Sequence, residues 1–594
     1  MNTDIENLFK DKVIGHPAGL FVIFFTEMWE RFSFYGMRIL LVLFLTAPVI
    51  SENPGWEWPR EHALALIGTY GSLLYLTPIV GGWIADKITG YKWAVIIGCF
   101  IMMLGHAAMV FETPFSLYAG LALLIIGTGF FKPNMTSMIS EMYKGKESKK
   151  DGAYTIYYMG VNAGAFFGMM LCGYLAENIG WSYGFGLAGI FMLLGLIQFW
   201  LAKDLFGQIG ERPSKIHEVE IPKDLNEAEP FEKFEKPESI KLNPFTTLDK
   251  VLIVLSSLGG ILYLFNDPLS KIGNINLLPF SIGIMDGSNV TVLTALALFL
   301  YLIISRISRY TPIVRDRIIA VSVFGVFTVF FFAAFEQSLG SMTIFARDYT
   351  ERTLTGSSAT TFKIIDLLLT VGPLVIITWV LYLLFKKTYS KIPYSNIILG
   401  VSFAFLWYVV YYKVNNEFTK DATEVPATWF GILNSFFIIT LAPFFSKWWE
   451  SKFNPSAAMK YGIGLILLGL GFGFLVFGTL GIDQGAKTAS VSMIFLILAY
   501  LFHTMGELCI SPVGLSYLSK LVPGRMIGFM FGIWYLAIAI GQKAAGTMGG
   551  MIDKITEEHS LSTFFLIFTL VPAAVGVISM LLNPVLKKLM HGVR

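Results

Sequence analysis

The first long apolar segment of the chain carries a cluster of ionisable side chains in its middle. Four of them are spaced by four, four and three residues and therefore share one helical face: Glu27, Arg31, Tyr35 and Arg38. Glu30 lies at the edge of that face. Each charge costs a few kcal/mol at the centre of a membrane unless it is paired. The face is therefore expected to line a water-filled cavity or a protein interface.

A structural cluster of salt bridges that locks this helix to a neighbour is the plain alternative. Buried ion pairs are weak stabilisers, because desolvation of the two charges offsets most of their Coulomb attraction. Charges inside membrane segments mark pathways for ions or substrates by default. We therefore favour a functional interpretation of this cluster.

The composition of the whole chain is that of a membrane protein. Of its 594 residues, 55% are hydrophobic and 14% are charged, whereas soluble domains carry roughly a quarter of charged residues. Apolar runs of about 18 to 25 residues recur along the chain, and this length matches a bilayer core of about 30 Å. A formal net charge of +3 gives no indication of nucleic-acid binding.

Sixteen apolar segments are predicted to cross the membrane as helices, with fourteen as the alternative if two between 250 and 412 do not cross. The first six segments are 18–47, 63–86, 92–111, 115–140, 153–177 and 183–202. The other ten are 250–266, 289–306, 317–346, 361–385, 394–412, 427–447, 460–480, 491–520, 526–549 and 563–586.

A change of composition divides the chain. Residues 203–250 contain 19 charged side chains in 48 and five prolines, so this stretch is predicted to be a solvated cytoplasmic linker. The expected organisation is an N-terminal six-helix half (1–202), the linker, two accessory helices (251–312) and a C-terminal half (313–594). Two further extra helices are expected within that half, near 361–412.

The charges between the segments predict the orientation. Lys and Arg concentrate in alternate loops, namely 86–92, 143–150, 306–317, 386–391, 447–460 and 587–594, which the positive-inside rule places in the cytoplasm. The N-terminal residues lack the basic and apolar regions of a signal peptide. We expect a multi-pass protein of the cytoplasmic membrane with both termini inside.

The loop after the second segment has a recognisable pattern. It reads Gly-Gly-Trp-Ile-Ala-Asp-Lys-Ile-Thr-Gly-Tyr-Lys over residues 81–92. This resembles the Gly-x-x-x-Asp-(Lys/Arg)-x-Gly-x-(Lys/Arg) loop of the major facilitator superfamily. The resemblance implies an all-α polytopic fold in which two six-helix halves surround a central cavity.

Three further motifs resemble the signatures of the proton-coupled oligopeptide transporters. They are Glu-x-x-Glu-Arg-Phe-x-x-Tyr-Gly over 27–36, Phe-Phe-Lys-Pro-Asn over 130–134 and Gly-Glu-Leu-Cys-Ile-Ser-Pro over 506–512. Phe34 stands where the family has a tyrosine. The resemblance covers about 18–200, 317–346 and 427–586, and it does not account for the segments at 361–412.

The resemblance implies di- and tripeptides as substrates. These are zwitterions, so their ends need opposite charges on two sides of one cavity. Arg38 and Lys132 are expected to hold the carboxylate, as a fork and a point charge. Glu507 and Asn434 are expected to hold the amino group. The peptide backbone and side chains are assigned to Asn162, Tyr35, Tyr75 and Trp534; for the last two, ordinary packing is an equal alternative.

Two ion pairs between the halves follow from the same resemblance. The family pairs Arg38 with Glu336, and Lys132 with Glu507, and pairs that form and break as a cavity closes and opens suit alternating access. Permanent bridges remain the alternative. Proton coupling is assigned to Glu27, Glu30 and Arg31, because protonation of one carboxylate changes which partner Arg31 can hold.

Several other functions are disfavoured. No phosphate-binding glycine loop indicates an ATP-driven pump, and no nucleophile–base or metal-ligand pattern indicates an enzyme, a metal or another cofactor. A receptor or scaffold would have no need for facing charges in both halves. A symporter of protons and peptides is the leading prediction, and a proton-coupled transporter of another zwitterion or anion, such as nitrate or a peptide-like metabolite, is the alternative. No pattern indicates an oligomeric state.

Overall fold

Sixteen long helices dominate the protein in a computed structural model that describes residues 6–146, 149–212, 243–521 and 527–593. The first six are α2 (Ala18–Thr46), α3 (Arg60–Ile84), α4 (Tyr91–Met109), α5 (Pro114–Met142), α6 (Lys150–Asn178) and α7 (Trp181–Ala202). Short turns of π and 3-10 helix follow α3 (Ala85–Thr89) and α7 (Lys203–Phe206). Most of the predicted linker, residues 213–242, lies outside the described residues.

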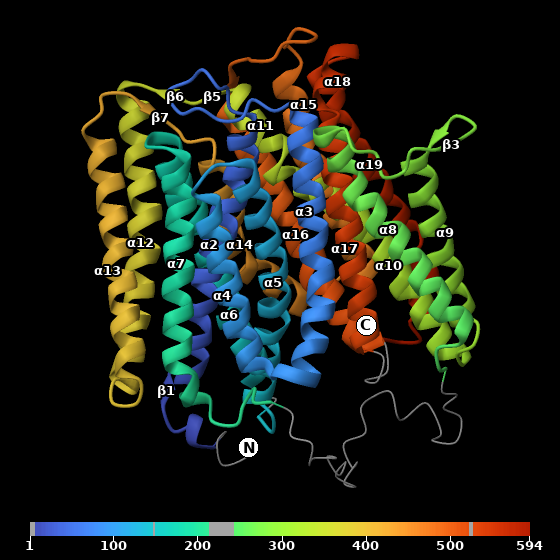
Figure 1. Ribbon diagram of the computed structural model, residues 1–594, viewed down its shortest axis with the longest axis horizontal. Helices are drawn as coiled ribbons and strands as arrows, with labels where there is room; N and C mark the ends of the chain where they lie inside the picture. Colours follow the sequence, from blue (N-terminus) through green and yellow to red (C-terminus); the bar gives the residue numbers. More distant parts are fainter. Residues whose placement is uncertain (1–5, 147–148, 213–242, 522–526, 594) are drawn as a thin grey trace.

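Two pairs of helices lie outside the two halves, one pair before α10 (Pro312–Phe335) and one pair after α11 (Ser341–Asp348). They are α8 (Thr247–Gly273), α9 (Gly287–Ile307), α12 (Gly356–Thr388) and α13 (Pro393–Phe418). Each pair is antiparallel, and we call them the α8–α9 hairpin and the α12–α13 hairpin. In Figure 1 the two hairpins stand at opposite flanks of the bundle.

The remaining long helices are α10 (Pro312–Phe335), α14 (Trp429–Glu450), α15 (Ala457–Thr479), α16 (Met493–Leu521), α17 (Ile527–Gly550) and α19 (Leu561–Leu581). The short helices are α11 (Ser341–Asp348), α18 (Ile552–Glu558) and α20 (Asn583–Leu589). We call α2–α7 the N-terminal half, and we call α10, α11 and α14–α19 the C-terminal half.

Fourteen of the described helices are long and apolar enough to cross a membrane by length and composition. The other two long helices, α2 and α17, have 29 and 24 residues and run beside them (Figure 1). The helical fold and the sixteen segments agree with the sequence analysis. Some helices begin with a side-chain cap; for example, Thr113 and Ser116 form a capping box before α5.

Two seams join the halves. α3 of the N-terminal half packs along α17, and α6 packs along α14. Within the halves, α2 packs against α6 and α7, and α15 packs against α16 and α19. The buried apolar residues form one continuous core across the halves.

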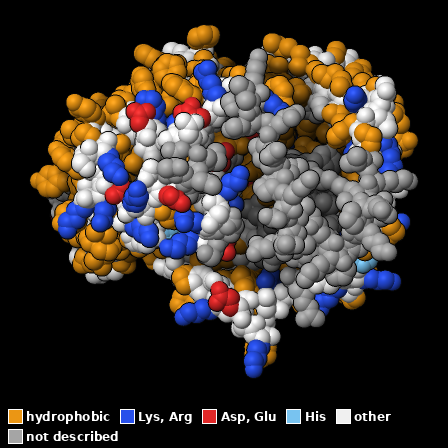
Figure 2. Space-filling model, turned by 90° about the horizontal axis from the view of Figure 1, so that it is seen from below, with side chains coloured by type: hydrophobic (Ala, Val, Ile, Leu, Met, Phe, Trp, Pro, Cys, Tyr) orange, Lys and Arg blue, Asp and Glu red, His pale blue; other side chains and the backbone are white. Residues whose placement is uncertain are grey.

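Two small sheets, each of two short strands, lie at one end of the molecule, which is uppermost in Figure 1 and which we call the outer end, following the loop charges. There β5 (Thr350–Glu351) pairs with β8 (Val491–Ser492), and β6 (Thr353–Leu354) pairs with β7 (Thr423–Glu424). Two isolated hairpins, β1–β2 (Lys12–Val13, His16–Pro17) and β3–β4 (Ser281–Ile282, Met285–Asp286), complete the strands of the described residues. Figure 2 views the opposite, inner end, where Lys and Arg side chains gather.

One predicted helix is broken. The apolar pattern over 317–346 predicts a continuous helix with Glu336 in its interior, but α10 ends at Phe335 and Glu336–Leu339 form a 3-10 turn before α11. The polar run 336–338 and Gly340 favour a break, because glycine costs a helix interior about 1 kcal/mol. Tyr500 on α16 donates to the carbonyl of Ser338 at the break (3.1 Å).

Candidate transport site

A close approach of two helices positions the charges of α2. Gly160, Gly164 and Gly168 recur every fourth residue of α6, and a Cβ atom at Gly164 would lie 2.2 Å from the carbonyl oxygen of Met28. Small residues at this spacing let membrane helices approach closely. The sequence of α6 therefore presses α2 against it and buries the charged face.

Arg31 is shared between two carboxylates. Its Nε lies 3.1 Å from Glu27 Oε1, and its Nη2 donates to Glu30 Oε1 (2.9 Å). All three residues are at most 5% exposed. Two carboxylates and one guanidinium carry a net charge of −1, so a single proton makes the cluster neutral. The structure thus brings together the three residues to which the sequence analysis assigned proton coupling.

Arg38, two turns further along α2, reaches across to the C-terminal half. Its Nη2 donates to Glu336 Oε2 at 2.9 Å. Both side chains are nearly buried, at 4% and 9% exposed. The structure therefore contains the first of the two ion pairs expected between the halves. Glu336 makes this pair from the first residue of the 3-10 turn after α10.

Sequence reasoning missed a second partner of Arg38. The same Nη2 donates to Gln542 Oε1 on α17 at 2.7 Å, and Gln542 is 2% exposed. Its neighbour Lys543 is a buried cation that was also overlooked. Both are polar residues inside an apolar segment, so the criterion that selected Glu336 would have found them.

Lys132 has no carboxylate partner in the described part of the chain. Its Nζ lies 4.3 Å from the centre of the Tyr75 ring, a cation–π contact. Its charged neighbours include Glu27, Glu30 and Arg31. The expected pair between Lys132 and Glu507 is thus not formed in this state, and its formation in another state stays a prediction.

Glu507 on α16 is held by a neighbouring helix. Asn434 on α14 donates to its Oε2 at 2.8 Å and to the hydroxyl of Thr504 at 3.1 Å. The two residues predicted to hold a peptide amino group therefore lie together. They form a polar pole of the C-terminal half, as Arg38 and Lys132 do in the N-terminal half.

The aromatic and amide residues of the prediction differ in their surroundings. Tyr35, Tyr75 and Asn162 are half-buried, whereas Trp534 is 4% exposed and packs closely against Gly514. Asn162 donates to the carbonyl of Tyr158 within its own helix (2.9 Å).

Tyr158 indicates an open space between the halves. It is 53% exposed, yet its charged neighbours include Glu27 of the N-terminal half and Glu507 of the C-terminal half. A side chain that lies between two halves and remains exposed lines a cavity rather than the outer surface. The two charged poles therefore border a common space.

Comparisons with known proteins agree with these features. A model of the POT family matches residues 92–221 and 404–567. The chain is 30% identical to the peptide transporter YePEPT of Yersinia enterocolitica over 93% of this chain and 91% of that protein. It is 29% identical to the di-/tripeptide transporter of Lactococcus lactis subsp. cremoris, over 99% of this chain and 100% of the relative.

Solved structures show the same fold. The crystal structure of a peptide transporter POT in complex with sulfate matches with a TM-score of 0.67 and 25% identity, over 99% of both chains. A POT family transporter in complex with 5-aminolevulinic acid matches with a TM-score of 0.69 and 23% identity. The likeness to proton-coupled oligopeptide transporters is confirmed, and the chain belongs to the POT family of transporters.

Proposed function

We propose that the protein is a proton-coupled symporter that imports di- and tripeptides by alternating access. The observation that carries the proposal is the ion pair between Arg38 and Glu336, which links the two halves beside a cavity with oppositely charged poles. Relatives named as peptide and di-/tripeptide transporters support the substrate class. These relatives do not support nitrate or a peptide-like metabolite as the substrate.

The charged poles suit a zwitterion. Arg38 and Lys132 are proposed to bind the peptide carboxylate, because charge-assisted hydrogen bonds are the strongest available in a protein site. Glu507 and Asn434 are proposed to bind the amino group. Asn162, Tyr35, Tyr75 and Trp534 are proposed to contact the peptide backbone and side chains.

The outer end is closed in this structure. Arg60 at the start of α3 donates to Asp348 and Asp553 of the C-terminal half, at 2.7 Å each. Glu177 at the end of α6 accepts from the backbone N–H groups of Ala427 and Thr428, at 2.8 and 3.0 Å. With the outer end closed and Lys132 apart from Glu507, we assign the structure to a state in which the inner end is open.

We place the protein in the cytoplasmic membrane with both termini inside. The basic side chains on the inner end (Figure 2) support this orientation through the positive-inside rule. Both chain ends lie toward that end in Figure 1, as an even number of crossings requires. Sixteen crossings are proposed.

Uptake into proteoliposomes tests the function. A labelled dipeptide is expected to accumulate when the lumen is alkaline relative to the medium, whereas its free amino acids are not. One pH unit is worth about 1.4 kcal/mol, or about tenfold accumulation if one proton moves with each peptide. Accumulation of nitrate or free amino acids, with dipeptides inert, would refute the peptide assignment.

A further inference from the structure

Arg38 is held by one charged and one uncharged acceptor. Both Glu336 and Gln542 accept from its Nη2, at 2.9 and 2.7 Å. The amide comes from α17 and the carboxylate from the break after α10, so the two acceptors approach from different elements of the C-terminal half. A change in the charge of Glu336 leaves the amide in place.

The position of the Gln542 amide is fixed by its surroundings. A Cβ atom at Gly71 on α3 would lie 2.5 Å from Gln542 Oε1 and 3.3 Å from Arg38 Nη2. The glycine therefore opens the space in which the amide meets the guanidinium. The side chain of Gln542 is 2% exposed, so water does not compete freely for this hydrogen bond.

We propose that Gln542 is a positioning residue that keeps Arg38 directed at the C-terminal half when Glu336 is neutralised. This inference rests on the proposed function, because neutralisation of Glu336 by a proton or by a peptide amino group is part of the transport cycle. With Glu336 neutral, the uncharged amide alone holds Arg38 and keeps the outer end closed only weakly. The halves therefore separate more readily than they would if residue 542 were a second carboxylate.

Other titratable groups lie near the Arg38–Glu336 pair, and the two variants described below leave them unchanged. They are Tyr35 and Arg31 on α2, Tyr70 and Tyr75 on α3, Lys132 on α5 and Glu507 on α16.

Two substitutions with opposite expected effects test the role of Gln542. Gln542→Glu gives Arg38 two carboxylate partners, and both must be neutralised before Arg38 is released. The pH profile of dipeptide exchange should therefore move to lower pH, with about tenfold less exchange at neutral pH. Gln542→Leu leaves Glu336 as the acceptor, so release needs less acid and the profile should move to higher pH.

The opposite direction of the two shifts separates positioning from a structural role, which would lower exchange in both variants without moving either profile. Profiles that coincide with that of the wild type, or that shift in the same direction, would overturn the inference. Wild-type protein is measured in the same preparation. Its failure to take up dipeptide would refute the proposed function instead.

A second inference concerns the hairpins, and it rests on different contacts. The α8–α9 hairpin lies against the seam between α3 and α17. Asp267 on α8 forms an ion pair with Lys543 on α17, and Lys543 also donates to Thr69 on α3 at 2.9 Å. Thr69 in turn donates to the carbonyl of Leu264 on α8 (3.0 Å). One buried cation therefore ties the hairpin to both halves.

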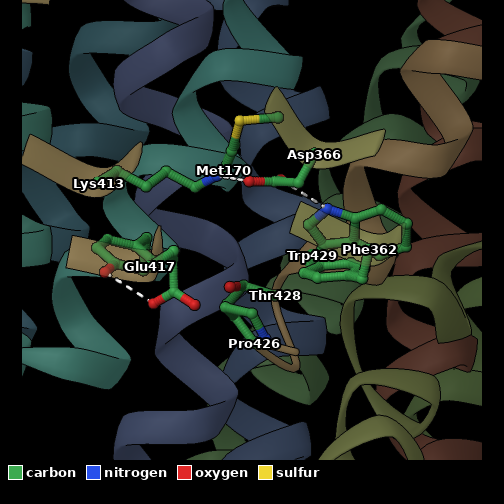
Figure 3. Close-up of a pocket in the computed structure, with 9 residues that line it drawn as sticks. Met170, Phe362, Asp366, Lys413, Glu417, Pro426, Thr428 and Trp429 are labelled. Carbon is green, nitrogen blue, oxygen red and sulfur yellow. Dashed lines mark hydrogen bonds and ion pairs between the residues drawn. The ribbon is translucent and has the colours of Figure 1, made fainter. Parts of the chain in front are cut away.

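The α12–α13 hairpin makes an equivalent set of contacts at the other seam. Figure 3 shows Asp366 of α12 between Lys413 of α13 and Trp429 of α14. The Nε1 of Trp429 donates to the Asp366 carboxylate at 3.2 Å. Glu417 on α13 accepts from the hydroxyl of Tyr174 on α6 at 2.9 Å. The hairpin thus contacts α14 of the C-terminal half and α6 of the N-terminal half.

We infer that the two hairpins are straps across the seams that stabilise the state with a closed outer end. All of these contacts lie in the outer part of their helices, where α3 must leave α17 and α6 must leave α14 for the outer end to open. Opening would separate Lys543 from Thr69 and Trp429 from Asp366. A buried polar group that loses its partner is strongly destabilising, so the straps favour closure.

Distances between spin labels at the outer end test the straps without any substrate. Exposed positions Glu52, after α2, and Thr488, before β8, are replaced by labelled cysteines. Asp267→Asn weakens the first strap, and Trp429→Phe weakens the second by removing the indole N–H that donates to Asp366. Each variant is expected to increase the population with a long separation by about twofold or more.

Asp249→Asn is the matched control. Asp249 is a buried carboxylate of the same α8–α9 hairpin, but its ion pairs are with Arg306 (3.0 Å) and Arg309 (2.8 Å) at the inner end. It should leave the distances as in the wild type. Unchanged distances in both strap variants, or an equal change in the control, would overturn the inference. Neither outcome bears on peptide transport.

Discussion

Replacing Glu30 with glutamine is expected to abolish accumulation of dipeptide driven by a pH gradient, yet to leave exchange of peptide across the membrane measurable. Glu30 and Glu27 share Arg31 within a buried cluster of net charge −1. The substitution leaves Glu27 alone with Arg31 as a neutral ion pair, so the excess negative charge that attracts a proton is gone. Exchange needs no net proton movement and should persist, while the accumulation ratio falls to about 1.

Parallel uptake and exchange assays in proteoliposomes check this result. Glu52→Gln, a carboxamide substitution at an exposed outer position, should behave as the wild type. Glu27→Gln should resemble Glu30→Gln, because either change neutralises the cluster. Wild-type pH dependence in Glu30→Gln would mean that the carboxylates are structural, and the coupling site would have to be sought at Glu336 or Glu507.

The strongest features of the fold could be predicted from the sequence because the bilayer enforces them. Long apolar runs must become helices, since no backbone group in lipid can remain without a partner. Charges such as Glu27 and Arg31 stand out against that background, and their spacing of four residues is enough to place them on one helical face. The pairing of Arg38 with Glu336 followed from the family resemblance instead.

Other features could not be predicted, because hydropathy does not register them. The break after Phe335 lies inside an apolar run and depends on local polar residues and on tertiary partners such as Tyr500. Gln542 could have been noticed as a polar residue in an apolar segment, but its pairing with Arg38 joins residues that are distant in sequence. Which seam each hairpin covers depends on pairs distant in sequence, such as Asp267 with Lys543.

Replacing Lys132 with alanine is expected to abolish both accumulation and exchange of dipeptide. Lys132 faces the cavity from α5 with no carboxylate partner in the described residues, and it rests 4.3 Å from the centre of the Tyr75 ring. A cation in this position is available to a peptide carboxylate. A charged hydrogen bond contributes about 1.5–3 kcal/mol, so its loss should weaken binding by about 10- to 100-fold.

Binding of a labelled dipeptide to the purified protein separates this effect from a failure to change conformation. Lys144→Ala, which removes an exposed lysine just after the same helix, is the matched control and should bind and exchange as the wild type does. Lys132→Arg should keep part of the binding, because it retains the charge but not the compact ammonium. Wild-type binding in Lys132→Ala would place the peptide carboxylate on Arg38 alone and would leave Lys132 with a gating role opposite Glu507.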